Sequence, residues 1–364
     1  IVYFWLLPAY VSWYLMMPKQ VGGKIYSDAL TRFVFILFLL FSVPTGLHHQ
    51  FTDPGIPVWL KTAHFFTTLV IAVPSLITAF SLMSALEIAG RSNGGNGLLG
   101  WIPKLGWGNP SVVMQLLAML TFILGGITGI INASYTVNSV VHNTAFIPGH
   151  FHITVGTAVA QTIMGVCFWL VPYLTGNKLW MPKLGVAAAW IYTVGVLTFS
   201  RGQMWGGIDG MPRRSAMGAA KYQPESWALS NQLTAIGGVL MAIAGVIFIL
   251  MMVMTVFSRN KGVTEIPVAE AVIGPRAGWA GLDNLGRWTL LAIMLIVLAY
   301  GPTFWDLSRN AGTAVPVRMP QMGYMPLGMP PNLGPWLFAM YGAFAVAALV
   351  GFWKLLLGKQ AGKS

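Results

Sequence analysis

Histidine is the residue type in this sequence best suited to chemistry, and five of the six histidines fall in two short motifs. The first motif is HHQFTDPG from His48, and the second is HNTAFIPGHFH from His142. Imidazole is the commonest metal ligand among side chains and suits copper and iron. The single cysteine, Cys167, excludes an intrachain disulfide and any multi-cysteine metal site. The motifs therefore indicate metal binding through histidine nitrogen.

His150 and His152 stand two positions apart, and Pro148 before them suits a first helical turn. Two steps along an α-helix rotate a side chain by about 200°. The two rings should then face opposite sides of the helix and serve two separate centres. Gly149 and Gly156 leave room for a large flat group beside the backbone. The alternative is a pair of histidines that hydrogen-bond to neighbouring helices.

His48 and His49 are adjacent and follow Pro44-Thr45-Gly46, a pattern that loosens the end of a helix. Neighbouring histidines on unwound backbone can converge on one metal ion. The alternative is a polar loop pair that faces lipid headgroups. Two histidine groups at one membrane depth favour the metal.

The composition indicates an all-α, polytopic membrane protein, because 56% of the residues are hydrophobic and only 8% are charged. Soluble domains carry about 25% charged residues. A membrane helix needs about 20 apolar residues. We expect one membrane domain over 1–364 with nine spans, at about 1–17, 33–48, 62–86, 110–133, 147–174, 184–200, 227–257, 288–304 and 335–353.

The loops alternate in positive charge, since one alternate set holds fourteen of the 21 Lys and Arg residues. The positive-inside rule places that set in the cytoplasm. All six histidines, including His64, then lie near the outer face. Ionisable residues are costly inside a membrane and indicate function. The net charge of +12 does not indicate a nucleic-acid partner, because the basic residues are scattered between apolar runs.

Three motifs together resemble subunit I of haem–copper oxidases, most closely the B family of cytochrome c oxidases. They are IVYFWLLPAY around Tyr3, HHQFTDPG from His48, and GHFH, which contains His150 and His152. The resemblance runs from Ile1 to about Pro302. The ninth expected span departs from it, because the family members end soon after the residues that match Pro302.

The resemblance implies two haems, one high-spin and one low-spin, and one copper ion. It implies that His150 is the axial ligand of the high-spin haem and that His152 is one of two ligands of the low-spin haem. His48 and His49 match two of three copper histidines. Tyr3 matches the tyrosine joined covalently to the third, which in the family lies four residues earlier. We therefore expect the chain to lack an N-terminal part that holds that histidine and the second low-spin ligand.

The resemblance also assigns residues around the haem carboxylates. Arg213 and Arg214 match a pair that binds haem propionates, and guanidinium forks suit carboxylates. The alternative is a loop pair that contacts lipid phosphates. His142 and Asn138 match positions near the propionates and a proton exit region.

Hydroxyl side chains suggest a route for protons. Tyr3, Tyr10 and Tyr14 are spaced by seven and four, so they share one helix face. Ordinary packing of Ser and Thr between membrane helices is the alternative. The family has a hydroxyl-lined channel that matches Tyr3, Tyr10, Tyr14, Ser27, Ser75 and Thr78.

The resemblance implies a terminal respiratory oxidase in a prokaryotic inner membrane. Such an enzyme reduces dioxygen with electrons from cytochrome c and couples this to proton uptake and translocation. The implied partners are subunit II, small accessory subunits and membrane lipid. A quinol-driven oxidase and a nitric oxide reductase are alternatives with the same fold, and Tyr3 favours oxygen chemistry. A transporter whose histidines bind protons or ions is an alternative of another class.

Overall fold

A computed structural model describes residues 2–53, 58–214, 223–274, 284 and 286–297. The chain divides into two compact units, Ile1–Ala280 and Gly281–Ser364. The second unit contributes one described helix, Gly286–Val297, which is short and apolar. The expected ninth span at 335–353 lies outside the described residues, and the single membrane domain over 1–364 stays a prediction.

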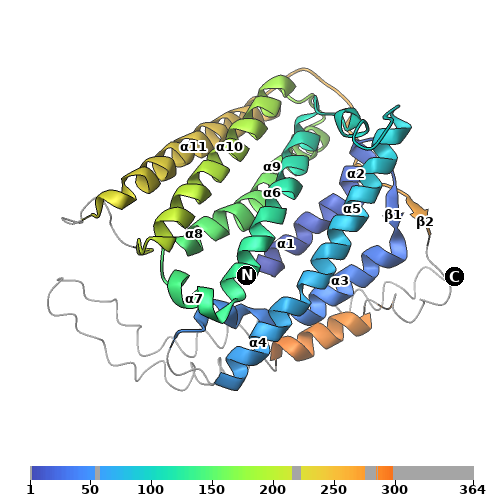
Figure 1. Ribbon diagram of the computed structural model, residues 1–364. Helices are drawn as coiled ribbons and strands as arrows, with labels where there is room; N and C mark the ends of the chain where they lie inside the picture. Colours follow the sequence, from blue (N-terminus) through green and yellow to red (C-terminus); the bar gives the residue numbers. More distant parts are fainter. Residues whose placement is uncertain (1, 54–57, 215–222, 275–283, 285, 298–364) are drawn as a thin grey trace, which may run out of the picture. The chain divides into compact units, whose positions relative to one another are not determined.

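The first unit is built from helices, and Figure 1 shows how they lie beside one another. Several of the α-helices continue directly into a π-helix or a 3-10 helix, so that one continuous helical segment has more than one label. In chain order they are α1 (Val2–Val11), a π-helix (Ser12–Met16), α2 (Met17–Gln20), α3 (Asp28–Ser42), a 3-10 helix (Val43–Gln50), α4 (Val58–Val70), α5 (Ala72–Ser92), a 3-10 helix (Ile102–Lys104), α6 (Pro110–Ala133), α7 (Tyr135–Val141), α8 (Phe146–Phe151), a π-helix (His152–Gln161), α9 (Thr162–Thr175), α10 (Pro182–Ile208), a 3-10 helix (Glu225–Trp227) and α11 (Ala228–Val256).

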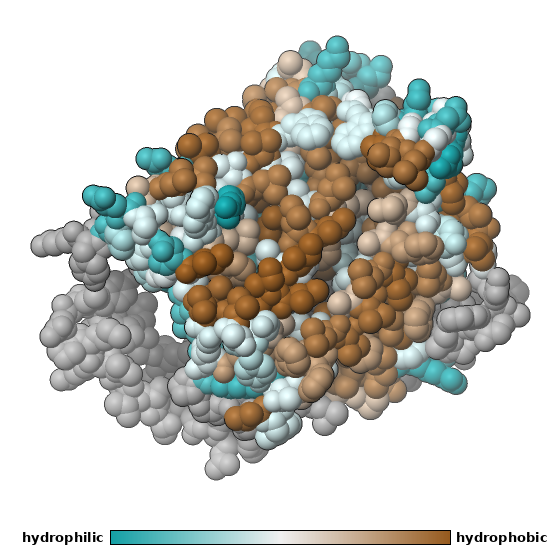
Figure 2. Space-filling model, viewed as in Figure 1, coloured by the Kyte–Doolittle hydropathy of each residue, from teal (hydrophilic) through white to brown (hydrophobic). Residues whose placement is uncertain are grey.

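Five helical stretches among the described residues are long and apolar enough to cross a membrane. They are Val58–Ser92, Pro110–Ala133, Phe146–Thr175, Pro182–Ile208 and Glu225–Val256. The remaining expected spans that the structure describes also overlap helices. Hydrophobic residues cover much of the face shown in Figure 2, as a surface in contact with lipid requires. The predicted all-α membrane bundle is confirmed.

Local sequence signals explain where the helices begin and end. The Asn109 side chain accepts a hydrogen bond from Ser111 N at 3.0 Å, and Pro110 occupies the first turn of α6. Gly176 ends α9 in the left-handed conformation, with a φ of 64°.

One small element was not predicted, a parallel pair of strands, β1 (Ile25–Ser27) and β2 (Ala271–Ile273). Ser27 pairs with Ile273, and the main chain before β2 is held by a bond from Ala269 N to Leu15 O at 2.8 Å. The extended chain after α11 thus returns to the start of α3. Ser27 lies where the two segments meet.

Candidate metal centre

Three of the predicted metal ligands gather at one place. His48 and His49 lie on the 3-10 helix Val43–Gln50, and their ring centroids are 4.1 Å apart. The ring of His150, on α8, lies 5.9 Å from the ring of His49. His48 and His150 are buried. Residues about 100 positions apart in sequence therefore form one imidazole cluster.

The hydroxyl of Thr68 fixes the tautomer of His48. It donates to His64 O at 2.6 Å, so its oxygen is left to accept from Nδ1 of His48 at 3.0 Å. A neutral imidazole carries one proton, and the nitrogen without it is the one that binds metal. Thr68 thus leaves Nε2 of His48 free to coordinate.

Thr128, on α6, fixes the tautomer of His150 in the same way. Its hydroxyl donates to Gly125 O at 2.7 Å and accepts from Nδ1 of His150 at 2.8 Å. A Cβ atom on Gly129 would meet Cε1 of His150 at 3.4 Å, a tight contact. The glycine lets α6 approach the ring, and Nε2 of His150 is left as the coordinating nitrogen.

Two buried amides hold the other side of the cluster. Asn132 Nδ2 lies 2.9 Å from Nδ1 of His49, and Asn138 Nδ2 donates to Asn132 O at 2.6 Å and to His48 O at 2.9 Å. With the Asn132 amide donating, the His49 proton is on Nε2. That proton must leave, or the amide must turn, before Nε2 of His49 binds a metal.

His152 belongs to a different place. Its Nδ1 donates to Pro148 O at 2.7 Å, and its ring lies 4.2 Å from the ring of Phe199 on α10. His150 faces α6 through Thr128, so the two histidines contact different neighbours. The Pro148 carbonyl leaves Nε2 of His152 free to coordinate.

The donor set fits haem iron and copper, but the rings stand close together. Metal–imidazole bonds are about 2 Å long. Two such bonds in line between His49 and His150 would need about 4 Å. The distance from each ring centroid to its nitrogen would take up the rest of the 5.9 Å between the centroids. No complete metal-binding group is present among the described residues. Binding of both metals therefore requires these two rings to move apart.

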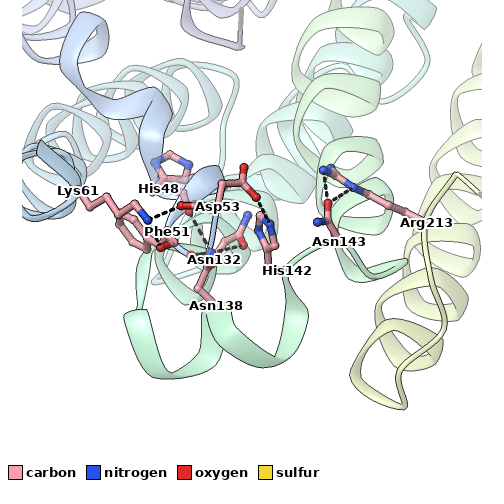
Figure 3. A network of polar contacts seen from close by, with 9 residues as sticks. All are labelled: His48, Phe51, Asp53, Lys61, Asn132, Asn138, His142, Asn143 and Arg213. Atoms are coloured by element: carbon pink, nitrogen blue, oxygen red, sulfur yellow. Dashed lines mark hydrogen bonds and ion pairs between the residues drawn. The ribbon is translucent and has the colours of Figure 1, made fainter. Parts of the chain in front are cut away.

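Three of the four predicted propionate residues, Arg213, His142 and Asn138, make polar contacts near the histidines (Figure 3). His142 Nε2 pairs with Asp53 Oδ1 at 2.8 Å, and Lys61 Nζ donates to the main-chain oxygens of Phe51 and Asp53. Arg213 donates twice to Asn143 Oδ1, at 2.8 and 3.2 Å.

The two arginines differ in their surroundings. Burial and the charge of Arg214 lower the pKa of Arg213, and the Asp53 carboxylate opposes this. Arg214 is exposed and has a φ of 59°, in the left-handed region. Two adjacent guanidinium groups repel each other, and an anionic ligand between them would relieve the repulsion.

The predicted proton-route hydroxyls occur on α1, on the π-helix that follows it, on β1 and on α5. Tyr10 and Tyr14 are buried, and the Tyr14 hydroxyl faces Thr78 and Ser81. The hydroxyls of Tyr14, Thr78 and Ser81 therefore lie near one another between the π-helix and α5. Ser75, Thr78 and Ser27 lie on α5 and β1, and Ser27 is 9% exposed. Tyr3 lies on α1, and its side chain is outside the described ones.

Sequence reasoning missed the residues that position the histidines. Thr68, Thr128, Asn132 and Asp53 contact histidine rings, and Lys61 binds the main chain after His49. All five are polar residues within or next to the expected spans, and that placement was the available signal. Which histidine each one meets depends on helix packing, which the sequence does not show.

Comparison with known proteins gives a consistent picture. The family model described as "Cytochrome C and Quinol oxidase polypeptide I" matches residues 1–240. Cytochrome c oxidase subunit 1 of Thermus thermophilus is 44% identical over 316 residues, which are 84% of this chain and 56% of that protein. A probable quinol oxidase subunit 1 of Staphylococcus haemolyticus is 27% identical over 295 residues, 79% of this chain and 39% of that protein.

A solved structure of a haem–copper terminal oxidase dimer is also similar, with a TM-score of 0.76 and 40% sequence identity. The match covers 83% of this chain and 55% of the chain in that structure. This chain thus spans about half the length of the Thermus subunit and of the chain in that structure.

Proposed function

Because this chain belongs to the family of cytochrome c and quinol oxidase polypeptide I, we propose that it forms part of the catalytic subunit of a terminal respiratory oxidase. The enzyme reduces dioxygen to water with electrons from cytochrome c and couples this to proton uptake and translocation. The observation that carries the proposal is the gathering of His48, His49 and His150, with His152 turned toward a different helix.

The residues would hold the cofactors as follows. His150 ligates the high-spin haem, His152 ligates the low-spin haem, and His48 and His49 ligate copper. The haems and copper supply electron transfer and oxygen binding when they are present. Three oxygen acceptors would fix which ring nitrogen binds the metal. Thr68, Thr128 and Pro148 accept from Nδ1 of His48, His150 and His152 in that order. Each contact keeps Nδ1 protonated and leaves Nε2 available.

The polar network would bind the haem propionates. Arg213 and Arg214 supply guanidinium donors, and a propionate that displaced Asn143 from Arg213 would gain a charge-assisted bond. His142 and Asn138 lie between this region and the histidines, so they are placed to contact propionates and departing protons.

Protons would enter along the hydroxyl line. The line consists of Tyr10 on α1, Tyr14 on the π-helix that continues it, Ser27 on β1, and Ser75 and Thr78 on α5. β1 packs against α5. Water molecules would join those hydroxyls of the line that do not contact one another. Tyr3 would stand at the end of this line and give a proton and an electron to dioxygen.

We further propose a multi-pass location in a prokaryotic inner membrane, with subunit II, small accessory subunits and lipid as partners. A quinol-driven oxidase is the second candidate, because relatives described as probable quinol oxidases match 79% of this chain.

Optical difference spectra of membranes that express the full-length gene test the proposal. Reduction with dithionite should reveal two haem components, of which one binds carbon monoxide. An oxygen electrode with reduced cytochrome c or with a quinol then identifies the electron donor. Membranes without haem bands would refute the oxidase and favour the transporter.

A further inference from the structure

Lys61, in the first turn of α4, reaches across to the segment that carries the adjacent histidines. Its Nζ atom donates to Asp53 O at 2.6 Å and to Phe51 O at 2.7 Å. The side chain is partly buried. Figure 3 shows the ammonium pointing at the main chain between Phe51 and Asp53. One cation therefore joins α4 to the chain just after His49.

The two carbonyls that Lys61 binds lie just after the 3-10 helix, which ends at Gln50 with Phe51 as its C-cap. Carbonyls in such a segment need donors from outside the helix when they are removed from water. An ammonium group has three donors and no acceptor, so it can satisfy two carbonyls at once. Lys61 thus fixes the direction in which the chain leaves the histidine pair.

The same helix holds His48 directly. Thr68 lies seven residues after Lys61, two turns along the same face of α4, and accepts from Nδ1 of His48. On the other side, Asn138 donates to His48 O at 2.9 Å, and the ring of Tyr135 stacks on that of Phe51 at 4.2 Å. The histidine segment is therefore held in two ways. Thr68 binds the side chain of His48, and Lys61 binds the main chain that follows His49.

Lys61 and His142 bind different oxygens of Asp53. The ammonium takes the main-chain oxygen of Asp53, and the carboxylate is left to pair with His142 Nε2 at 2.8 Å. An ammonium close to the carboxylate would compete for that pairing. The contact of Lys61 with the carbonyls keeps the two interactions separate.

We propose that Lys61 is a positioning residue for the copper pair, whose ammonium holds the backbone after His49 so that the rings of His48 and His49 converge. The proposal rests on the proposed function, because it assigns copper to these two histidines. The competing role is a lysine that only marks membrane orientation or contacts lipid phosphate.

Three variants of the full-length oxidase test the proposal. Lys61→Met keeps the apolar stem and removes the donors, and Lys61→Arg keeps two or more donors. Lys104→Met removes an exposed charge in the loop before α6 and serves as the matched control. For each purified oxidase, metal analysis gives the copper-to-haem ratio, chelator competition gives copper affinity, and infrared spectroscopy records carbon monoxide bound to copper.

We expect Lys61→Met to bind copper about tenfold more weakly, the lower end of the range for residues that support a ligand. Its carbon monoxide band should broaden while its haem content stays unchanged. Lys61→Arg should restore both copper readouts, and Lys104→Met should match the unmodified oxidase.

Wild-type copper affinity and bandwidth in Lys61→Met would overturn the proposal, as would a Lys61→Arg variant as defective as Lys61→Met. If Lys61→Met loses haem as well, Lys61→Gln decides, because one amide still donates. Intermediate copper affinity then supports the proposal, and unchanged affinity overturns it. An unmodified oxidase that contains haem but no copper would instead refute the copper assignment in the proposed function.

Discussion

The hydroxyl of Thr128 accepts a hydrogen bond from Nδ1 of His150 at 2.8 Å while it donates to Gly125 O. Because its only proton is used on the carbonyl, the threonine oxygen can act toward His150 only as an acceptor. The arrangement orients the imidazole and directs Nε2 away from α6. Such outer partners raise the basicity of a ligating histidine.

Thr128→Val should therefore weaken the bond between His150 and the high-spin haem iron while leaving the haem in place. The valine fills the same volume but accepts no hydrogen bond. Resonance Raman spectroscopy of the reduced oxidase should show a lower iron–histidine stretching frequency. Thr128→Ser keeps the acceptor and is the control. An unchanged frequency in Thr128→Val would show that the Thr128 contact does not tune this ligand.

His150→Ala and His152→Ala should remove different haem signals. His150 faces α6 and His152 faces α10, so each loss should affect one centre. We expect His150→Ala to abolish the carbon monoxide-binding component and to keep the low-spin bands, with the reverse for His152→Ala. Loss of the same spectral component in both variants would contradict the assignment to separate centres.

Tyr3→Phe should keep both haems and the copper, because the ring is retained. Turnover with oxygen should fall by about 100-fold or more, since the phenolic proton and electron are removed. An oxygen electrode measures the rate, and metal analysis with optical spectra checks the cofactors. Oxygen consumption near the wild-type rate would refute the catalytic role of Tyr3.

Thr78→Val should slow proton uptake without affecting electron entry. Thr78 is buried and faces the Tyr14 hydroxyl, so its loss interrupts the proposed hydroxyl line. Stopped-flow reduction should be slower by about tenfold for the high-spin haem and unchanged for the low-spin haem.

Thr198→Val is the control for Thr78→Val. Thr198 is a partly buried threonine on α10 with the same type of bond to a carbonyl one turn earlier. This variant should reduce both haems at the normal rate. Equal slowing of the two haems in Thr78→Val would instead favour a packing role for Thr78.

The membrane bundle could be predicted from the sequence, because long apolar runs such as 110–133 need only lipid to become helices. The opposite placement of His150 and His152 was likewise inferred from helical rotation. Their motifs, together with Tyr3, also identified the family. These inferences depend on local periodicity and on residue type.

Tertiary structure decided which groups meet. Thr128 and His150 are 22 residues apart on separate helices, and Asn132 and His49 are 83 apart. The sequence indicates only that Lys61 is a positively charged residue in a loop. In the structure it binds the main-chain oxygens of Phe51 and Asp53. Helix packing fixes such contacts through side-chain shape across the bundle, and no local pattern records that shape.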